Sequence, residues 1–457
     1  MDFSGQNTNI YRKERMNNIK FSATPWLQNA FLFIFSLIFT LAIGEWLFPK
    51  FLNKIPFRLY GGVENNLRVL AQYSKNSVIP ENYLAILGDS NSVGLGDLYI
   101  DLTQNSKKWY PDYAPAHFIN KKVGLDVISF GFSGAGSFDG IWSGPINQLN
   151  LVNSRKEFDL PPPKTILIIF YEGNDIADNL KFIAENYRGN KNITELVSFI
   201  KFNKWLNHQF QESVDENRSG FETNLIFTKF LIKSVKNVFL EFIKKSNKGN
   251  ESHFRNHRFI FPAVPLTQAI INGNTVPLPM HLQAPPLFNS EIQAVRRVIS
   301  FEESKNIWIK LNRAGYYIFE SAVKKLSRKF PDSDIKIIYL PSVLSTYKII
   351  SPRASFLSNM GDGGLFDLNK LLRGGIVDTH ILFQRHLEVC REIQKISENL
   401  KTPFFDTTNY LRDASSKGYI HGPKDWDHLN ESGYRALSDG ISQFILHPDK
   451  SYQNCTN

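Results

Sequence analysis

Cysteine is scarce in this sequence: only Cys390 and Cys455 occur among 457 residues. Two cysteines exclude both a disulfide framework and a cysteine-ligated zinc site. Cys390 falls within a predicted helix, where we expect a buried apolar side chain, and Cys455 lies close to the C-terminus. Cysteine usage therefore does not fix the redox compartment.

The sequence also lacks repeats and the compositional biases of fibrous or disordered chains. The 28 glycines and 22 prolines are scattered, which excludes a collagen-like or coiled-coil rod. Disorder over most of the chain is excluded by 37 Phe, 17 Tyr and 7 Trp. The length supports one large folded domain or two to three average ones.

Acidic residues are the minority, at 43 against 53 basic ones, which gives a net charge of +10. The excess favours anionic surroundings such as lipid headgroups or acidic glycans. No arginine-rich or zinc-finger pattern accompanies it, so we expect no nucleic-acid partner.

One long hydrophobic run is present near the N-terminus. Residues 30–44 carry no charge, and Trp26 and Trp46 bracket them as interfacial anchors would. The whole stretch 26–48 reaches the roughly 20 residues that span a bilayer. We predict a transmembrane signal anchor over 26–48, with residues 1–25 as a cytoplasmic tail.

The flanking charges orient this anchor. Four basic residues precede it, which favours a cytoplasmic N-terminus and an extracytoplasmic remainder: Arg12, Lys13, Arg15 and Lys20. Basic residues on the far side weaken the asymmetry. A cleaved signal peptide is one alternative, although residues 42–44 make a poor cleavage site. A buried soluble helix is the other, although such a helix at a surface would show a polar stripe.

Beyond a linker predicted over 49–81, short apolar runs alternate with longer mixed segments. Five runs have the length and composition of strands: 83–87, 125–130, 165–171, 335–340 and 403–407. Helical periodicity precedes the fourth and the fifth. Strands separated by helices indicate crossover connections and a parallel sheet. We therefore predict an α/β domain over 82–450.

The third and fourth strands are too far apart for one crossover, which predicts an insertion at about 180–300. Within it, residues 225–245 form a basic amphipathic stretch, followed by a proline-rich run. Packing of this helix on the domain, with solvated lysines, is the simpler interpretation. Attachment to a membrane surface through its lysines is the alternative.

Polar and glycine-rich segments follow three of the predicted strands. Gly88-Asp89-Ser90 follows the first strand, which places a serine at the edge where open α/β sheets bind ligands. The second strand ends in residues 129–136, whose glycine-rich loop can aim a backbone N–H at a ligand. Asn174, after the third strand, can donate to a developing oxyanion.

A base and a carboxylate occur together near the C-terminus. Asp425-Trp426-Asp427-His428 offers a histidine and, three residues earlier, an acid to orient it. A serine, a histidine and a carboxylate are the parts of a nucleophilic acyl-transfer site.

The four blocks in this order resemble the SGNH (GDSL-type) esterase and acyltransferase superfamily. The resemblance covers most of residues 82–446 apart from the insertion. It implies a three-layer α/β/α fold of flavodoxin type. Ser129 stands where the family has an asparagine, which loosens the alignment of the glycine loop.

The resemblance also implies roles for individual residues. Ser90 would be the nucleophile, His428 the general base and Asp425 the acid that holds His428. The N–H groups of Ser90 and Gly134 and the Asn174 amide would form the oxyanion hole. Gly134 is preferred over Gly131 by its distance from the strand end. Further polar residues are expected to be structural or ordinary, with no cofactor or metal: Asp89, Asp175, Asp378, His380 and His421.

These features predict a membrane-anchored serine esterase that hydrolyses acyl esters outside the cytoplasm. The location suggests a glycan or cell-envelope substrate. An O-acyltransferase that decorates an extracytoplasmic polysaccharide would use the same residues. A catalytically inactive glycan-binding protein with a vestigial site is the rival from another class.

Overall fold

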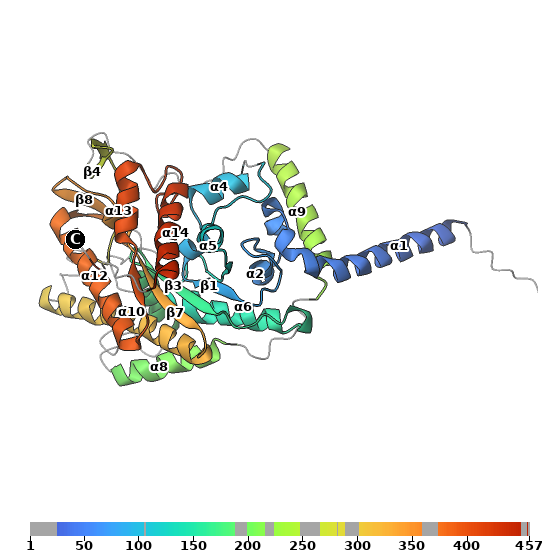
Figure 1. Cartoon of the computed structure of the whole chain (residues 1–457), viewed down its shortest axis with the longest axis horizontal. Coiled ribbons are helices and arrows are strands. Elements are labelled where there is room, and N and C mark those ends of the chain that lie inside the picture. Colours follow the sequence, from blue (N-terminus) through green and yellow to red (C-terminus); the bar gives the residue numbers. More distant parts are fainter. Residues whose placement is uncertain are drawn as a thin grey trace, which may run out of the picture.

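The computed structural model describes residues 25–104, 107–187, 199–214, 224–246, 266–280, 282–287, 301–358, 373–448 and residue 455. The predicted cytoplasmic tail lies outside these residues, apart from Pro25. A long helix, α1 (Pro25–Leu47), projects from a folded α/β body (Figure 1).

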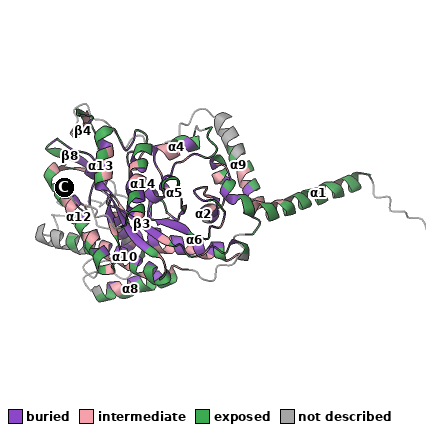
Figure 2. Cartoon of the chain, viewed as in Figure 1, coloured by how far each residue is buried: buried purple, intermediate pink, exposed green. Residues whose placement is uncertain are grey.

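Helix α1 has no buried residue, and Figure 2 shows it exposed along its length. It belongs to a helical span over Pro25–Lys54 that contains an 18-residue window with a mean hydropathy of 2.1. Apolar side chains such as Phe33, 71% exposed, point outward. By length and composition this helix is able to cross a membrane.

The body is organised around a five-stranded parallel sheet in the order β10-β7-β3-β1-β2. The five predicted strands are confirmed, with small shifts at their ends: β1 (Tyr83–Leu87), β2 (Asp126–Ser129), β3 (Thr165–Tyr171), β7 (Asp334–Leu340) and β10 (Phe404–Asp406). Central β3 pairs with β1 on one side and with β7 on the other.

Both faces of the sheet are buried. Along β3, Ile166, Ile168 and Phe170 belong to one core cluster, whereas Leu167, Ile169 and Tyr171 belong to another. Alternate side chains of a strand point to opposite faces, so the continuous apolar run reflects a strand covered on both sides.

Helices contribute to both clusters. The first cluster receives side chains from α6 (Gly144–Asn153), α7 (Asp175–Asn186), α10 (Phe301–Lys329) and α12 (Thr379–Leu400). The second receives them from α5 (Pro115–Val123), α13 (Thr408–Lys417) and α14 (Glu431–Leu446). The helical periodicity predicted before the fourth and fifth strands is confirmed by α10 and α12. The shorter helices are α2 (Arg68–Ala71), α3 (Ser90–Val93), α4 (Asp97–Gln104) and α11 (Val343–Thr346).

Residues 49–81, expected as a linker, are packed into the body. They form short 3-10 helices, η1 (Phe48–Lys54), η2 (Phe57–Gly62) and η3 (Asn65–Leu67), followed by α2. Leu52, Leu67 and Leu70 are at most 1% exposed and join the first core cluster. The apolar side chains of these turns are buried in the first core cluster. The segment therefore fixes the end of α1 to the domain.

The predicted insertion between β3 and β7 divides into separately packed pieces. Helix α8 (Phe199–Glu212) buries Phe202, Leu206 and Phe210 in the first cluster. Three short strands of the insertion lie on the opposite side of the main sheet, where they contribute to the second cluster. β4 (Gln268–Ile271) pairs with β5 (Asn274–Pro277). β6 (Leu282–Gln283) pairs with β8 (Arg353–Ser358), which follows the insertion and also pairs with β9 (Arg373–Asp378). Helix α9 (Ile226–Ser246) instead packs against α1, η1 and η2.

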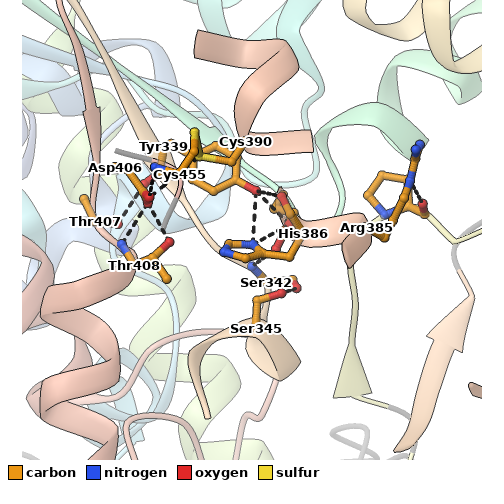
Figure 3. Close-up of polar contacts among 12 residues, drawn as sticks. Tyr339, Ser342, Ser345, Arg385, His386, Cys390, Asp406, Thr407, Thr408 and Cys455 are labelled. Atoms are coloured by element: carbon orange, nitrogen blue, oxygen red, sulfur yellow. Dashed lines mark hydrogen bonds and ion pairs between the residues drawn. A yellow bond between two sulfur atoms is a disulfide. The ribbon is translucent and has the colours of Figure 1, made fainter. Parts of the chain in front are cut away.

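The two cysteines are joined by a disulfide, contrary to the expectation of an unpaired buried Cys390. Cys390 is indeed fully buried in α12, but Cys455 approaches it with a Cα–Cα separation of 5.5 Å. Asp406 at the end of β10 accepts a hydrogen bond from the Cys455 N–H at 2.9 Å, next to the disulfide in Figure 3. The two cysteines are 65 residues apart, so no local sequence pattern indicated this pairing.

Candidate active site

Ser90 lies in a tight turn at the carboxyl end of β1. Gly88 adopts φ +141°, and a Cβ there would lie 2.7 Å from the Ile169 carbonyl oxygen, so only glycine fits between the strands. Asp89 caps the short helix α3 by accepting the Asn91 N–H at 2.9 Å. The turn holds Ser90 as the first residue of α3, with 4% of its surface exposed.

The loop before α14 brings His428 to this serine. The Nε2 atom of His428 lies 2.8 Å from Ser90 Oγ, and Nδ1 lies 2.7 Å from Asp425 Oδ2. With the Nδ1–H donating to the carboxylate, Nε2 presents a lone pair to the serine hydroxyl. The structure thus brings together all three residues predicted as a triad. Their side chains remain accessible, at 15% exposure for His428 and 20% for Asp425.

Asp97 positions the histidine loop, and sequence analysis missed it. Its carboxylate accepts the backbone N–H groups of Lys424 at 3.0 Å and Asp425 at 2.6 Å. The preceding residue, Gly96, packs so closely that a Cβ would lie 2.3 Å from the Leu429 carbonyl oxygen. The chain that follows Ser90 therefore also holds the loop that carries Asp425 and His428. Nothing in the local sequence distinguishes Asp97 from a surface acid.

Of the predicted oxyanion groups, Asn174 lies next to the turn that carries Ser90. The Asn174 side chain hydrogen-bonds to Asp89 and helps to counter the effect of burial on the pKa of that carboxyl. Gly134 adopts φ +72° with open space where a Cβ would stand. Gly131, by contrast, is packed so that a Cβ would meet Ser92 Oγ at 2.2 Å. Gly131 therefore packs against the turn that carries Ser90, whereas Gly134 lies in the loop at the edge of a pocket.

Two shifted pKa values characterise the site. Burial would lower the pKa of His428, but the hydrogen bond and charge of Asp425, followed by the charges of Asp427 and Asp89, outweigh it and raise the pKa. Burial raises the pKa of Asp89 against the opposing effects of Asn91 and His428. The carboxylates therefore stabilise a protonated His428, the state that forms when a histidine takes a serine proton.

A pocket of about 320 Å³ opens beside the glycine loop. Aromatic and polar residues line it, from the loop, the π-helical turn η4 (Phe138–Ser143) and α6: Phe132, Ser133, Gly134, Asp139, Asn147 and Gln148. Gln148 is nine-tenths buried, and its Oε1 has no hydrogen-bond partner among the described residues. The pocket thus places an aromatic ring beside polar side chains.

The remaining polar residues expected to be structural have local partners. Asp175 accepts the Tyr171 N–H at 2.9 Å, which ties the turn after β3. His421 Nδ1 lies 3.2 Å from the Tyr347 hydroxyl, and burial lowers the pKa of this histidine to about 3. Asp378 pairs with Arg353 at 3.2 Å, whereas His380 is exposed on α12.

One group of potential metal ligands occurs among the described residues, and it consists of Cys390, Asp406 and Cys455. Metal coordination by cysteine requires a thiolate, and both sulfurs are consumed by the disulfide. The residues present therefore do not form a metal site.

A second carboxylate–histidine pair lies in the interior and was not predicted. Glu172 Oε1 lies 2.8 Å from His386 Nδ1 and accepts the Tyr339 hydroxyl at 2.7 Å. The Ser342 N–H donates to Glu172 Oε2 at 2.7 Å. Figure 3 shows Tyr339 and Ser342 converging with His386. All four side chains are fully buried.

Comparison of the chain with protein-family models, with curated proteins and with solved structures finds no match in any of the three. The residues of the site and their geometry are therefore the basis for a functional proposal.

Proposed function

We propose that the chain is a serine esterase of SGNH type that hydrolyses acyl esters. The observation that carries the proposal is the continuous chain of hydrogen-bond distances from Ser90 Oγ through His428 to Asp425, at 2.8 and 2.7 Å. Nucleophile, base and orienting acid are within reach of one another, as acyl transfer requires. The parallel strand order and the two core clusters also support a three-layer fold of flavodoxin type.

In this mechanism Ser90 Oγ attacks the ester carbonyl carbon while its proton passes to His428 Nε2. The carbonyl oxygen becomes an oxyanion that the Ser90 and Gly134 N–H groups and the Asn174 amide stabilise. His428 then protonates the departing alcohol, which leaves an acyl group on Ser90. Water, deprotonated by His428, releases the acid and regenerates the serine.

Fluorophosphonate labelling tests the proposal directly, because this reagent modifies only an activated serine. We expect covalent labelling of the full chain and its loss in Ser90→Ala. Ser92→Ala is the matched control, since Ser92 lies in the same turn but donates to the Asp89 carbonyl at 2.6 Å. An unlabelled wild-type protein would instead favour the inactive glycan-binding alternative.

The pocket beside Gly134 favours a second candidate, an O-acyltransferase for which a sugar hydroxyl replaces water. An aromatic ring and neighbouring amide and carboxylate groups suit a carbohydrate, which stacks on Phe132 and hydrogen-bonds to groups such as Gln148. Incubation with an activated acyl ester and increasing glycan separates the two activities. Acylated glycan as the main product, and its selective loss in Gln148→Ala, would establish transfer; free acid throughout would retain hydrolysis.

We further propose that α1 anchors the protein in a membrane with the catalytic domain outside the cytoplasm. The exposed apolar helix supports the anchor. The disulfide supports an oxidising compartment, because disulfides rarely persist in the cytosol. Protease added to intact spheroplasts should digest the catalytic domain. Complete protection of that domain would reverse the orientation.

A further inference from the structure

Helix α9 is joined to the end of α1. Glu45, in the last turn of α1, accepts the N–H groups of Phe227 at 3.1 Å and Thr228 at 2.8 Å. The Phe227 ring packs over Gly44 and lies 5.5 Å from the Phe48 ring. The carboxylate thus caps the first turn of α9, and the start of α9 is fixed where α1 ends.

Among its described side chains, α9 packs on the domain through one face. Phe230 and Ser234 lie against Gly62, and Asn237 lies against Gly61. Lys233, on the same side, forms an ion pair with Glu64 at 2.6 Å. These contacts hold α9 along η2.

The neighbouring face of α9 is apolar and exposed. It carries Leu231, Ile232, Val235 and Phe239, with exposures of 37, 63, 67 and 62%. Leu231, Val235 and Phe239 continue at four-residue spacing from Phe227, so this row starts at the contact with α1. A solvated surface helix would carry polar residues there.

Further exposed apolar side chains lie near the end of α1. Phe51 in η1 is 56% exposed and Leu59 in η2 is 38% exposed, whereas Trp109 and Tyr110 are 65 and 52% exposed. The Trp109 carbonyl accepts the Phe57 N–H, and the Tyr110 hydroxyl donates to the Lys54 carbonyl, each at 2.8 Å. Trp and Tyr favour the boundary between lipid and water.

Basic side chains accompany these apolar groups. Six are exposed on the same segments: Lys50, Lys54, Arg58, Lys107, Lys108 and Lys236. Among the described acids near these segments, Glu45 and Glu64 are engaged with α9, and Asp112 pairs with Lys121. The surface is therefore complementary to anionic headgroups.

We propose that the exposed face of α9, together with the segments around Phe51 and Trp109, lies in the outer boundary of the bilayer that α1 spans. Figure 1 shows α9 crosswise to α1, at the flank of the domain from which α1 departs. A helix in that position runs along the membrane surface, with its apolar row about 5–10 Å into the headgroup and acyl boundary. The inference rests on the proposed α1 anchor. It gives the catalytic domain a fixed orientation on the membrane in place of a flexible tether.

Spin labels on the full chain in phosphatidylcholine–phosphatidylglycerol vesicles test this placement. Both native cysteines are disulfide-bonded, so a nitroxide attaches only to an introduced cysteine. Val235→Cys reports on α9 and Ile34→Cys on the anchor. Ile200→Cys is the matched control, an apolar position on α8 that is 82% exposed and distant from α1 in Figure 1.

At Val235→Cys and Ile34→Cys we expect more collisions with lipid-soluble oxygen than with an aqueous nickel chelate, and the reverse at Ile200→Cys. Ile232→Cys, on the same face of α9, replaces Val235→Cys if that variant misfolds. Lipid exposure at Ile34 with water exposure at Val235 would overturn the inference and leave the anchor intact. Exclusion of both reagents at Val235 would indicate a protein partner and would also overturn it.

Water exposure at both Ile34 and Val235 would remove the anchor and the inference together. Fluorophosphonate labelling of Ser90 in the same vesicles is an independent measurement. Lipid exposure at Val235 without serine labelling would support the inference while contradicting the esterase proposal.

Discussion

Two of the carboxylate–histidine pairs among the described residues have nearly equal separations and very different surroundings. Asp425 and His428 are 2.7 Å apart, and Glu172 and His386 are 2.8 Å apart. The first pair retains 20 and 15% exposure, whereas the second has none. The pair itself therefore does not define a site.

The two pairs differ in the environment of the histidine Nε2 atom, the ring nitrogen that does not face the carboxylate. His428 Nε2 faces the Ser90 hydroxyl at 2.8 Å, whereas His386 Nε2 is buried without a hydrogen-bond partner among the described residues. Glu172 is also held by Tyr339 and Ser342. In the proposed mechanism the first pair passes a proton to and from Ser90, whereas the second connects the ends of β3 and β7 with α12.

The largest expected effect comes from removing the nucleophile. Ser90→Ala deletes one hydroxyl and should leave the fold intact, while kcat for an aryl ester falls by about 10⁴-fold or more. Turnover and far-UV circular dichroism of the purified variant check both statements. Ser92→Ala should retain most of the activity. Equal losses of kcat in the two variants would contradict the proposal that Ser90 is the nucleophile.

The next effect concerns the orienting acid. Asp425→Asn should lower kcat by about 10³- to 10⁴-fold, because an amide at this position favours the wrong tautomer of His428. Asp427→Asn should cost less, since Asp425 Oδ2 is the carboxylate oxygen at 2.7 Å from His428 Nδ1, and the Asp427 N–H donates to Asp425 Oδ1 at 3.0 Å. The opposite ranking of the two variants would show that Asp427 is the functional acid.

The interior pair should respond in stability rather than in turnover. Glu172→Gln breaks a buried pair and should lower the free energy of unfolding by about 3–5 kcal/mol, with little change in kcat of the folded protein. Urea unfolding in detergent micelles measures the loss, with Asp425→Asn as the control of comparable stability to wild type. A variant as stable as wild type would contradict a structural role.

The same variant should show a defined pH dependence. Burial alone would raise the pKa of Glu172, but the charge and hydrogen bond of His386, the Ser342 N–H and the Tyr339 hydroxyl together lower it from 4.5 to about 2. A carboxyl with a lowered folded pKa stabilises the protein above its unfolded pKa. The stability difference between wild type and Glu172→Gln should therefore shrink as the pH falls from 4.5 to about 2.

The smallest effect should appear in the pH profile of Asp427→Asn. His428 must be neutral to act as a base, and the Asp427 charge contributes, after Asp425, to its raised pKa. Removal of that charge should move the acid limb of kcat/KM to lower pH and leave the plateau nearly unchanged. Asp413→Asn, which affects a surface acid paired with Lys417, should not move the limb. An unmoved limb in Asp427→Asn would exclude this electrostatic coupling.

Much of the fold was predictable because its signals are local. The apolar run of β3 extends over six of its seven residues, and the periodicity of α10 and α12 repeats within each helix. The segment 49–81 was harder, since its apolar residues follow neither strand nor helix periodicity over any length. Only their burial in the first core cluster shows that they belong to the domain.

The sequence by itself determined the candidate chemistry: a serine at the tip of β1, and an acid three residues before a histidine. Each depends on neighbours within a few residues, where backbone geometry limits the possible arrangements. Only the tertiary structure decided the rest: the approach of His428 to Ser90 across 338 positions, the hold of Asp97 on the Asp425 loop, the disulfide, and the position of α9 beside α1. Such contacts form when crossover connections bring strand ends and distant loops to one edge of the sheet. No local sequence pattern predicts which distant residues then come into contact.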